Sequence, residues 1–132
     1  MFFDDEADYS HYEDVDITPN EIVKARYIMR DEAFKRAYKM GVKMAFGTDQ
    51  VWPDMVTREF SYLLQLGVSH WDAIAMATIN SAELLGMKDL LGSIEIDKYA
   101  DIVAVADNPL KDIKALERVD FVMKGGEVIH RH

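Results

Sequence analysis

The feature that most constrains the fold is a short apolar run, residues 42–46, that leads into Gly47-Thr48-Asp49. Helical patterns lie on both sides of this run, so it is predicted to form a buried strand in a helix–strand–helix unit. In such α/β units, ligands and catalytic groups lie at the carboxyl end of the strand. Asp49 stands at that end and is our candidate catalytic residue. The alternative is that it only caps the next helix or turn.

The residues before this run predict one long helix, from about residue 18 to residue 40. Thr18, Pro19 and Glu21 form a capping box with proline at the first helical position. Apolar residues then recur at helical spacing. Gly41 follows them and supplies the left-handed conformation that commonly ends a helix.

The residues after Asp49 predict more helices and then a mainly β region. The expected α/β elements are a loop at 50–54, a helix ending at Gly67, a helix capped by Ser69 and Asp72, and a last turn capped from Asn80 that closes at Gly86. The expected later elements are strands at 93–96 and 100–105, one or two helical turns at 110–116, and a hairpin at 121–130 with a Gly125-Gly126 turn.

Acidic residues are unevenly distributed along the chain, whose net charge is −9. Residues 1–17 contain seven Asp or Glu and no Lys or Arg, whereas the remainder contains 17 acidic and 15 basic residues. Residues 1–17 are therefore expected to form a solvated acidic loop or tail. The near-neutral remainder argues against nucleic acid as a partner, because nucleic-acid binding requires a basic surface.

Several protein classes are excluded by composition. No apolar run is long enough to span a bilayer, and the first residues lack the basic and apolar regions of a secretory signal. The chain contains no cysteine, so disulfides and thiolate metal sites are excluded. We therefore expect a cytoplasmic protein with no membrane partner.

The histidines offer one further candidate metal site. His130 and His132 are two residues apart on a predicted strand, which would place both imidazoles on one face. A zinc site needs about three protein ligands, and no third ligand is evident, so an ordinary hairpin end is the alternative. No catalytic triad, phosphate-binding loop or dinucleotide fingerprint is present.

Four motifs occur in a characteristic order and carry a resemblance to a known family. They are Ala45-Phe46-Gly47-Thr48-Asp49, Ala77-Thr78-Ile79-Asn80-Ser81-Ala82-Glu83-Leu84-Leu85-Gly86, Leu91-Gly92-Ser93-Ile94-Glu95 with its continuation to Val103, and Val122-Met123-Lys124-Gly125-Gly126. Together they resemble the carboxyl-terminal part of the amidohydrolase superfamily, nearest to its Xaa-Pro dipeptidase-like and imidazolonepropionase-like branch. The resemblance covers residues 20–131.

This resemblance implies an α/β fold, the carboxyl-terminal fragment of a (β/α)8 barrel followed by strands of a small β-sandwich. Residues 18–87 would form the end of the barrel and residues 88–132 the sandwich portion. Asp49 would match the family's aspartate after the eighth strand, which binds the metal and takes a proton from the metal-bound water. The expected cofactor is a divalent metal, zinc, in the full-length protein, and whether this chain holds any is left open.

The chain departs from the family pattern in two respects. The family's other metal ligands, on earlier barrel strands, have no counterpart in this sequence, and His130 lies at the wrong end of the fold to replace them. Trp52-Pro53-Asp54 also stands where relatives often have a Pro-His element, and Ile96-Asp97 replaces the usual Pro-Gly. The missing ligands bear on whether this chain is active by itself. The replaced residues bear on which substrate is assigned.

Two hypotheses follow. In the first, the chain is part of a metal-dependent amidohydrolase that acts on amide or peptide-type C–N bonds of a small molecule or dipeptide, with Asp49 as metal ligand and general base. In the second, it is a non-catalytic fragment or module that self-associates through unpaired strands, residues 42–46 among them. A homo-oligomer is expected in either case.

Overall fold

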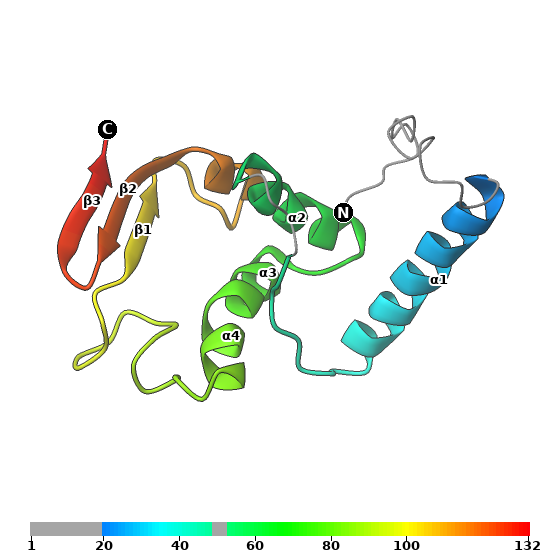
Figure 1. Ribbon diagram of the computed structural model, residues 1–132, viewed down its shortest axis with the longest axis horizontal. Helices are drawn as coiled ribbons and strands as arrows, with labels where there is room; N and C mark the ends of the chain where they lie inside the picture. Colours follow the sequence, from blue (N-terminus) through cyan, green and yellow to red (C-terminus); the bar gives the residue numbers. More distant parts are fainter. Residues whose placement is uncertain (1–19, 49–52) are drawn as a thin grey trace. The chain divides into compact units, whose positions relative to one another are not determined.

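A computed structural model of the protein describes residues 20–48 and 53–132 (Figure 1). The chain divides into two compact units, residues 1–42 and 43–132. The predicted acidic segment and Asp49 lie outside the described residues. The proposed division between residues 87 and 88 stays a prediction.

The first unit contains α1, a single helix over Asn20–Lys39, so the predicted long helix is confirmed. Gly41 ends it with φ of +76°. The Gly41 amide donates to the Tyr38 carbonyl at 2.9 Å, and the Val42 amide donates to the Ala37 carbonyl at 3.0 Å. These two bonds satisfy carbonyls that the last helical turn leaves without partners, as in a Schellman motif.

The second unit begins with three helices. They are α2 (Pro53–Gln65), α3 (His70–Ala77) and α4 (Ile79–Leu84). The predicted cap of α3 is confirmed, because the Ser69 hydroxyl accepts a hydrogen bond from the Asp72 amide at 3.0 Å. The predicted loop extended too far, because α2 already begins at Pro53. Proline suits the first helical turn, where its missing N–H removes no helical bond.

The helices enclose a small core. α2 packs against α3 and against a 3-10 helix, η2 (Ile113–Glu117), and α3 packs against α4. The buried apolar residues come from all four elements and the turns between them: Leu63, Leu66, Val68, Ala73, Met76, Ala82, Ile113 and Ala115. The predicted helical turn near residues 110–116 is therefore present and helps to close this core.

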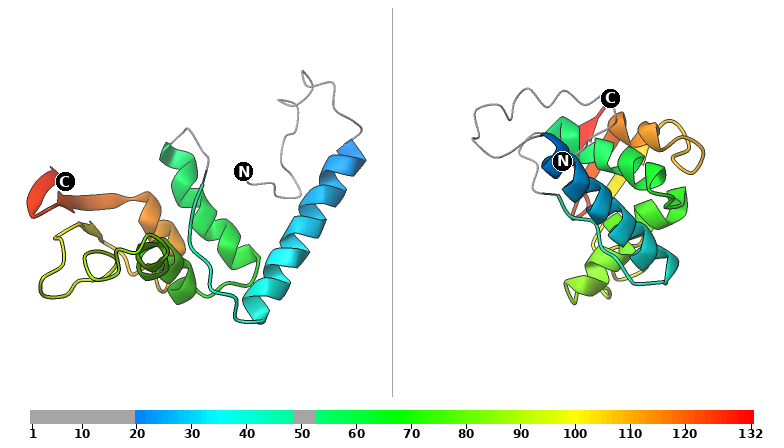
Figure 2. Two further views of the ribbon diagram at one scale, coloured as in Figure 1. Left: turned by 60° about the horizontal axis from the view of Figure 1, so that its bottom comes forward. Right: turned by 90° about the vertical axis from the view of Figure 1, so that its right-hand side faces the viewer.

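Among the described residues, three strands form one antiparallel sheet in the order β1-β2-β3 (Figure 1), and Figure 2 shows the chain from two further sides. The strands are β1 (Ile102–Val105), β2 (Val119–Lys124) and β3 (Glu127–Arg131). In register, β1 pairs Ile102 with Met123. The β2–β3 hairpin closes with Lys124 opposite Glu127. Gly125 and Gly126 have φ of +56° and +87°, the conformation of a type I′ turn, so the predicted hairpin is confirmed.

The expected strand at residues 93–96 is wrong. Lys98 donates through Nζ to the Ser93 hydroxyl at 2.6 Å and to the Glu95 carboxylate at 3.2 Å, and Asp97 has φ of +70°. The side chains thus bond within the segment and turn it, which competes with pairing to a neighbouring strand. The Ser-Ile-Glu-Ile alternation resembled a strand, yet Ile94 and Ile96 are 81% and 93% exposed.

The expected strand at residues 42–46 is also absent as regular structure in the described part of the chain. No described strand lies beside it, and its backbone instead bonds to the α3–α4 region.

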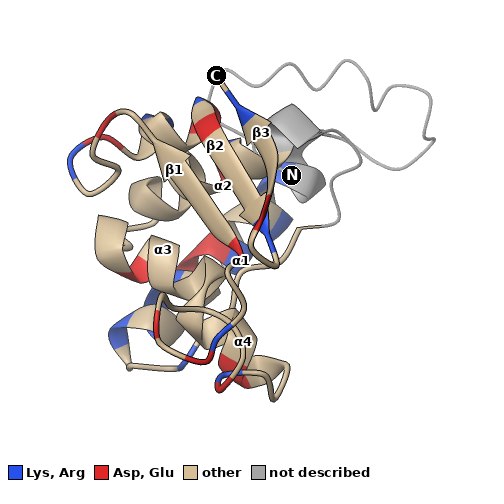
Figure 3. Cartoon of the chain, turned by 90° about the vertical axis from the view of Figure 1, so that its left-hand side faces the viewer, with Lys and Arg blue, Asp and Glu red and all other residues tan. Residues whose placement is uncertain are grey.

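None of the described helices is long and apolar enough to cross a membrane. Lys, Arg, Asp and Glu are interspersed along the described helices and loops (Figure 3).

Candidate functional site

The described part of the candidate site is residues 43–48, the segment that leads into Asp49. Asp49 itself lies outside the described residues, so its predicted role as catalytic residue and metal ligand stays a prediction. Of the two residues before it, Gly47 is exposed and Thr48 is half-buried. The site can therefore be built up to Thr48.

The backbone of this segment is held by the junction between α3 and α4. The Phe46 amide donates to the Met76 carbonyl at 2.9 Å. The Asn80 side-chain amide donates through Nδ2 to the Met44 carbonyl at 2.8 Å, in a partly buried position. The Ser81 hydroxyl lies 3.4 Å from the Phe46 carbonyl. Residues 44 and 46 are thus fixed by groups 30 or more residues away in the sequence.

Backbone carbonyls are available to accept hydrogen bonds at this junction because α3 ends there. The last carbonyls of a helix have no partner within it. The Met76 carbonyl accepts from the Phe46 amide and, at 2.7 Å, from the Ser81 hydroxyl. The Thr78 hydroxyl donates to the Ile74 carbonyl at 2.8 Å. The Phe46 amide and the hydroxyls of Thr78 and Ser81 together cap the carboxyl end of α3.

An aromatic contact reinforces the segment on another side. The rings of Phe46 and Phe60 stack with centroids 4.7 Å apart and planes 14° from parallel. Phe60 belongs to α2, so the segment contacts α2 as well as α3 and α4. Stacked aromatic pairs add about 0.5–1.5 kcal/mol beyond the area that they bury.

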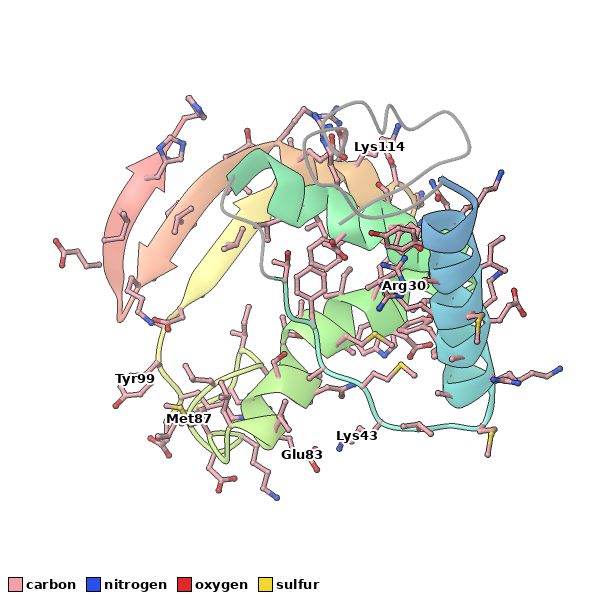
Figure 4. All side chains as sticks on the ribbon, turned by 45° about the vertical axis from the view of Figure 1, so that its right-hand side comes forward. Arg30, Lys43, Glu83, Met87, Tyr99 and Lys114 are labelled. Carbon is pink, nitrogen blue, oxygen red and sulfur yellow. The ribbon has the colours of Figure 1, made fainter. Side chains whose placement is uncertain are left out.

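A surface ion pair joins the start of the segment to α4. Lys43 donates to the Glu83 carboxylate (Figure 4). The hydrogen bond from Lys43, and then its charge, lower the pKa of Glu83. Both side chains are about half exposed, so solvent screens the pair and its contribution to stability is small.

Asn80 and Ser81 are site residues whose role was not predicted from the sequence. Asn80 was expected to open a capping motif, and this is wrong: Thr78 precedes α4, and Asn80 and Ser81 lie inside the helix. Their side chains reach back to the segment instead. A signal was present, because the short polar side chains of Asn and Ser readily bond to backbone groups outside the helical ladder.

The His130–His132 pair is brought together as its spacing predicts. The two rings lie 4.5 Å apart between centroids and are nearly perpendicular, on the β3 end of the sheet. Over residues 20–48 and 53–132, no group of three His, Cys, Asp or Glu side chains could hold a metal ion. The described residues therefore do not by themselves fit a metal centre.

The chain is similar to several hydrolases of known structure or activity. A Xaa-Pro dipeptidase, solved with methionine bound in its active site, is 38% identical with a TM-score of 0.76, over 92% of this chain and 31% of that one. Imidazolonepropionase of Shouchella clausii is 32% identical over 115 residues, 80% of this chain and 26% of that protein. Ochratoxinase of Aspergillus niger is 32% identical over 102 residues, 74% of this chain and 21% of that protein.

These relatives are much longer than the chain, which spans about a fifth to a third of their length. The model of one family, described as the amidohydrolase family, matches residues 20–129. That range contains nearly every described residue, including the segment at 43–48 and the α3–α4 junction that holds it. By this match, the chain belongs to the amidohydrolase family.

Proposed function

We propose that the chain is part of a metal-dependent amidohydrolase that hydrolyses amide or peptide-type C–N bonds. The observation that carries the proposal is the family match over residues 20–129, which includes Asp49. In this proposal, residues 18–87 are the last helices and eighth strand of a (β/α)8 barrel. Residues 88–132 contribute strands to a β-sandwich.

Asp49 is proposed as the general base and as one metal ligand. Its carboxylate would take a proton from the attacking water and return it to the leaving nitrogen, so that one group serves both proton transfers. Members of the family generally use divalent metals. A bound divalent metal, zinc in our proposal, lowers the pKa of a water and polarises the carbonyl. The remaining ligands would come from outside the described residues.

The substrate that we propose is a dipeptide or a small cyclic or linear amide. The names of the relatives support this class, since they include a Xaa-Pro dipeptidase, an imidazolonepropionase and an ochratoxinase. The segment at 43–48 supports the role of Asp49, because a catalytic carboxylate must be held in a fixed place and the backbone at Met44 and Phe46 is bonded to the helices.

Substitution of Asp49 in the full-length protein that contains this chain tests the proposal. We expect Asp49→Asn to lower kcat/KM for a dipeptide substrate by about 10²–10⁴-fold, the usual contribution of a positioned general base, because an amide cannot take the proton. Asp49→Ala should also lower the metal content. Asp89→Asn, on an exposed side chain, is the matched control and should leave both unchanged. Unchanged hydrolysis in both Asp49 variants would contradict the assignment.

A second proposal is that the chain self-associates through strand edges. In the described sheet, β1 and β3 have a neighbour on one side only, and every residue of β3 is exposed. Such edges favour pairing with another chain. Residues 42–46, which we expected to supply the edge, are a weaker candidate because their backbone is bonded to α3 and α4.

A further inference from the structure

The α3–α4 junction presents the segment at 43–48 with an ordered series of polar groups. The Asn80 side chain donates to the Met44 carbonyl, the Met76 carbonyl accepts from the Phe46 amide, and the Ser81 hydroxyl lies against the Phe46 carbonyl. The bonded residues are two apart. This is the spacing at which one side of a strand presents its backbone groups to a neighbour.

The series fixes which residues of the segment face the junction. A shift of the segment by one residue would move the Met44 carbonyl away from the Asn80 side chain and the Phe46 amide away from the Met76 carbonyl. A shift by two would keep the backbone pattern and would remove the ring of Phe46 from that of Phe60. The polar groups and the aromatic pair together therefore permit a single register.

Asn80 is the member whose chemistry is most specific. Its Nδ2 must donate to a carbonyl, in a partly buried position 36 residues away in the sequence. An aspartate at the same place has nearly the same shape but offers only acceptors, so it would face the Met44 carbonyl with like-signed dipoles. Ser81 also donates to the Met76 carbonyl and can keep that bond without the segment.

We propose that Asn80 is a positioning residue that sets the register of residues 43–48, and through it the position of the chain that leads into Asp49. Thr48 and Asp49 are joined by one peptide bond, which holds their Cα atoms about 3.8 Å apart. Only Gly47 and Thr48 separate Phe46 from Asp49, so a shift of residue 46 would move the chain that leads into Asp49. The effect on catalysis rests on the function proposed for Asp49, whereas the effect on register does not.

Hydrogen exchange on the 132-residue chain tests the structural part. We expect Asn80→Asp to raise the exchange rate of the Phe46 amide about tenfold, because loss of the Asn80 bond frees the segment from the Met76 carbonyl. Amides in the core of α2 should exchange as before. Asn108→Asp is the matched control: the Asn108 side chain accepts from the Leu110 amide through Oδ1, a bond that aspartate keeps.

Two outcomes would overturn the structural part. One is a Phe46 exchange rate that is unchanged in Asn80→Asp. The other is an increase spread equally over α2 and η2, which would indicate general loss of stability instead of release of the segment. An increase confined to residues 44–48 supports the proposal.

The catalytic part is tested in the full-length protein. We expect Asn80→Asp to lower kcat by at least tenfold with KM changed less than threefold, since the base is displaced while substrate contacts remain. If Asp49→Asn leaves hydrolysis intact, the proposed function fails and the exchange result still stands. If Asp49→Asn abolishes hydrolysis while Asn80→Asp frees Phe46 without lowering kcat, the positioning role fails.

Discussion

At the scale of single residues, Gly92 shows how closely the chain after α4 packs on that helix. Its φ is +91°, in the left-handed region that side chains disfavour. A Cβ placed there would lie 2.8 Å from the Ala82 Cβ and 3.0 Å from the Thr78 carbonyl oxygen. The second contact is with backbone, which cannot move aside as a flexible side chain would. Both the conformation and the space therefore require glycine.

We expect Gly92→Ala to lower the free energy of unfolding by about 2–4 kcal/mol, the sum of a left-handed backbone penalty and an overpacking cost. Gly67→Ala separates the two contributions. Gly67 has φ of +90° with nothing within 4 Å of the added Cβ, so its cost should be only about 1–2 kcal/mol. Denaturant unfolding of both variants checks the difference, and equal losses would show that the close contact relaxes.

At the scale of elements, the hairpin is tied to the chain before β1 by Asp101. Its carboxylate accepts from the Gly125 amide at 2.7 Å and from the Lys124 ammonium. The Gly126 amide donates to the Ala100 carbonyl at 3.1 Å. The hydrogen bond from Lys124, followed by that from Gly125, lowers the pKa of Asp101. The ionised carboxylate is therefore the form that holds the turn.

A lowered pKa in the folded state means that Asp101 stabilises the protein above the ordinary aspartate pKa, near 4. This contribution is lost as the pH falls through the folded-state pKa. We expect Asp101→Asn to lower the denaturation midpoint at pH 6 and to reduce the further fall between pH 6 and pH 3. Asp97→Asn, on an exposed turn residue, is the control and should keep the acid sensitivity of the parent chain. An unchanged pH profile in Asp101→Asn would contradict the assignment.

Local signals explain why some elements could be predicted and others could not. The end of α1 at Gly41, the Ser69 cap and the Gly-Gly hairpin each depend on residues that are neighbours in sequence. The segment at 42–46 was recognised as special, but its partners lie on α3 and α4, some 30 residues away. The bond from Asn80 to Met44 was not predicted for the same reason, since 36 residues separate the two. Sequence spacing alone could not show which carbonyl its side chain meets.

At the scale of the whole molecule, the described chain leaves many large apolar side chains in contact with solvent. Ile129 on β3 and Val103 on β1 are among them, so apolar groups lie on both outer strands of the sheet. Exposed apolar edges of this kind are commonly covered by further protein. The family relatives are longer than this chain, which spans about a fifth to a third of their length.

We therefore expect the 132-residue chain to form oligomers in solution, and the measured mass to fall on dilution. Ile129→Lys should shift the population toward monomer, because a charge on an outer strand opposes pairing with another strand. Leu110→Lys is the matched control, since Leu110 is exposed but lies outside the sheet. Light scattering after size exclusion measures the mass of each variant. A parent chain that is monomeric at every concentration would contradict self-association.

The shared carbonyl of Met76 has a consequence for how the molecule opens. Because one oxygen accepts from both the Phe46 amide and the Ser81 hydroxyl, unwinding of α3 at its end removes one of the bonds that hold residues 43–48. Release of the segment, in contrast, leaves the Ser81 bond to Met76 in place, so fraying of the α3 end should loosen the segment more than release of the segment loosens α3. Excursions of the helix terminus would then move the approach to Asp49, and a probe on α3 would report them.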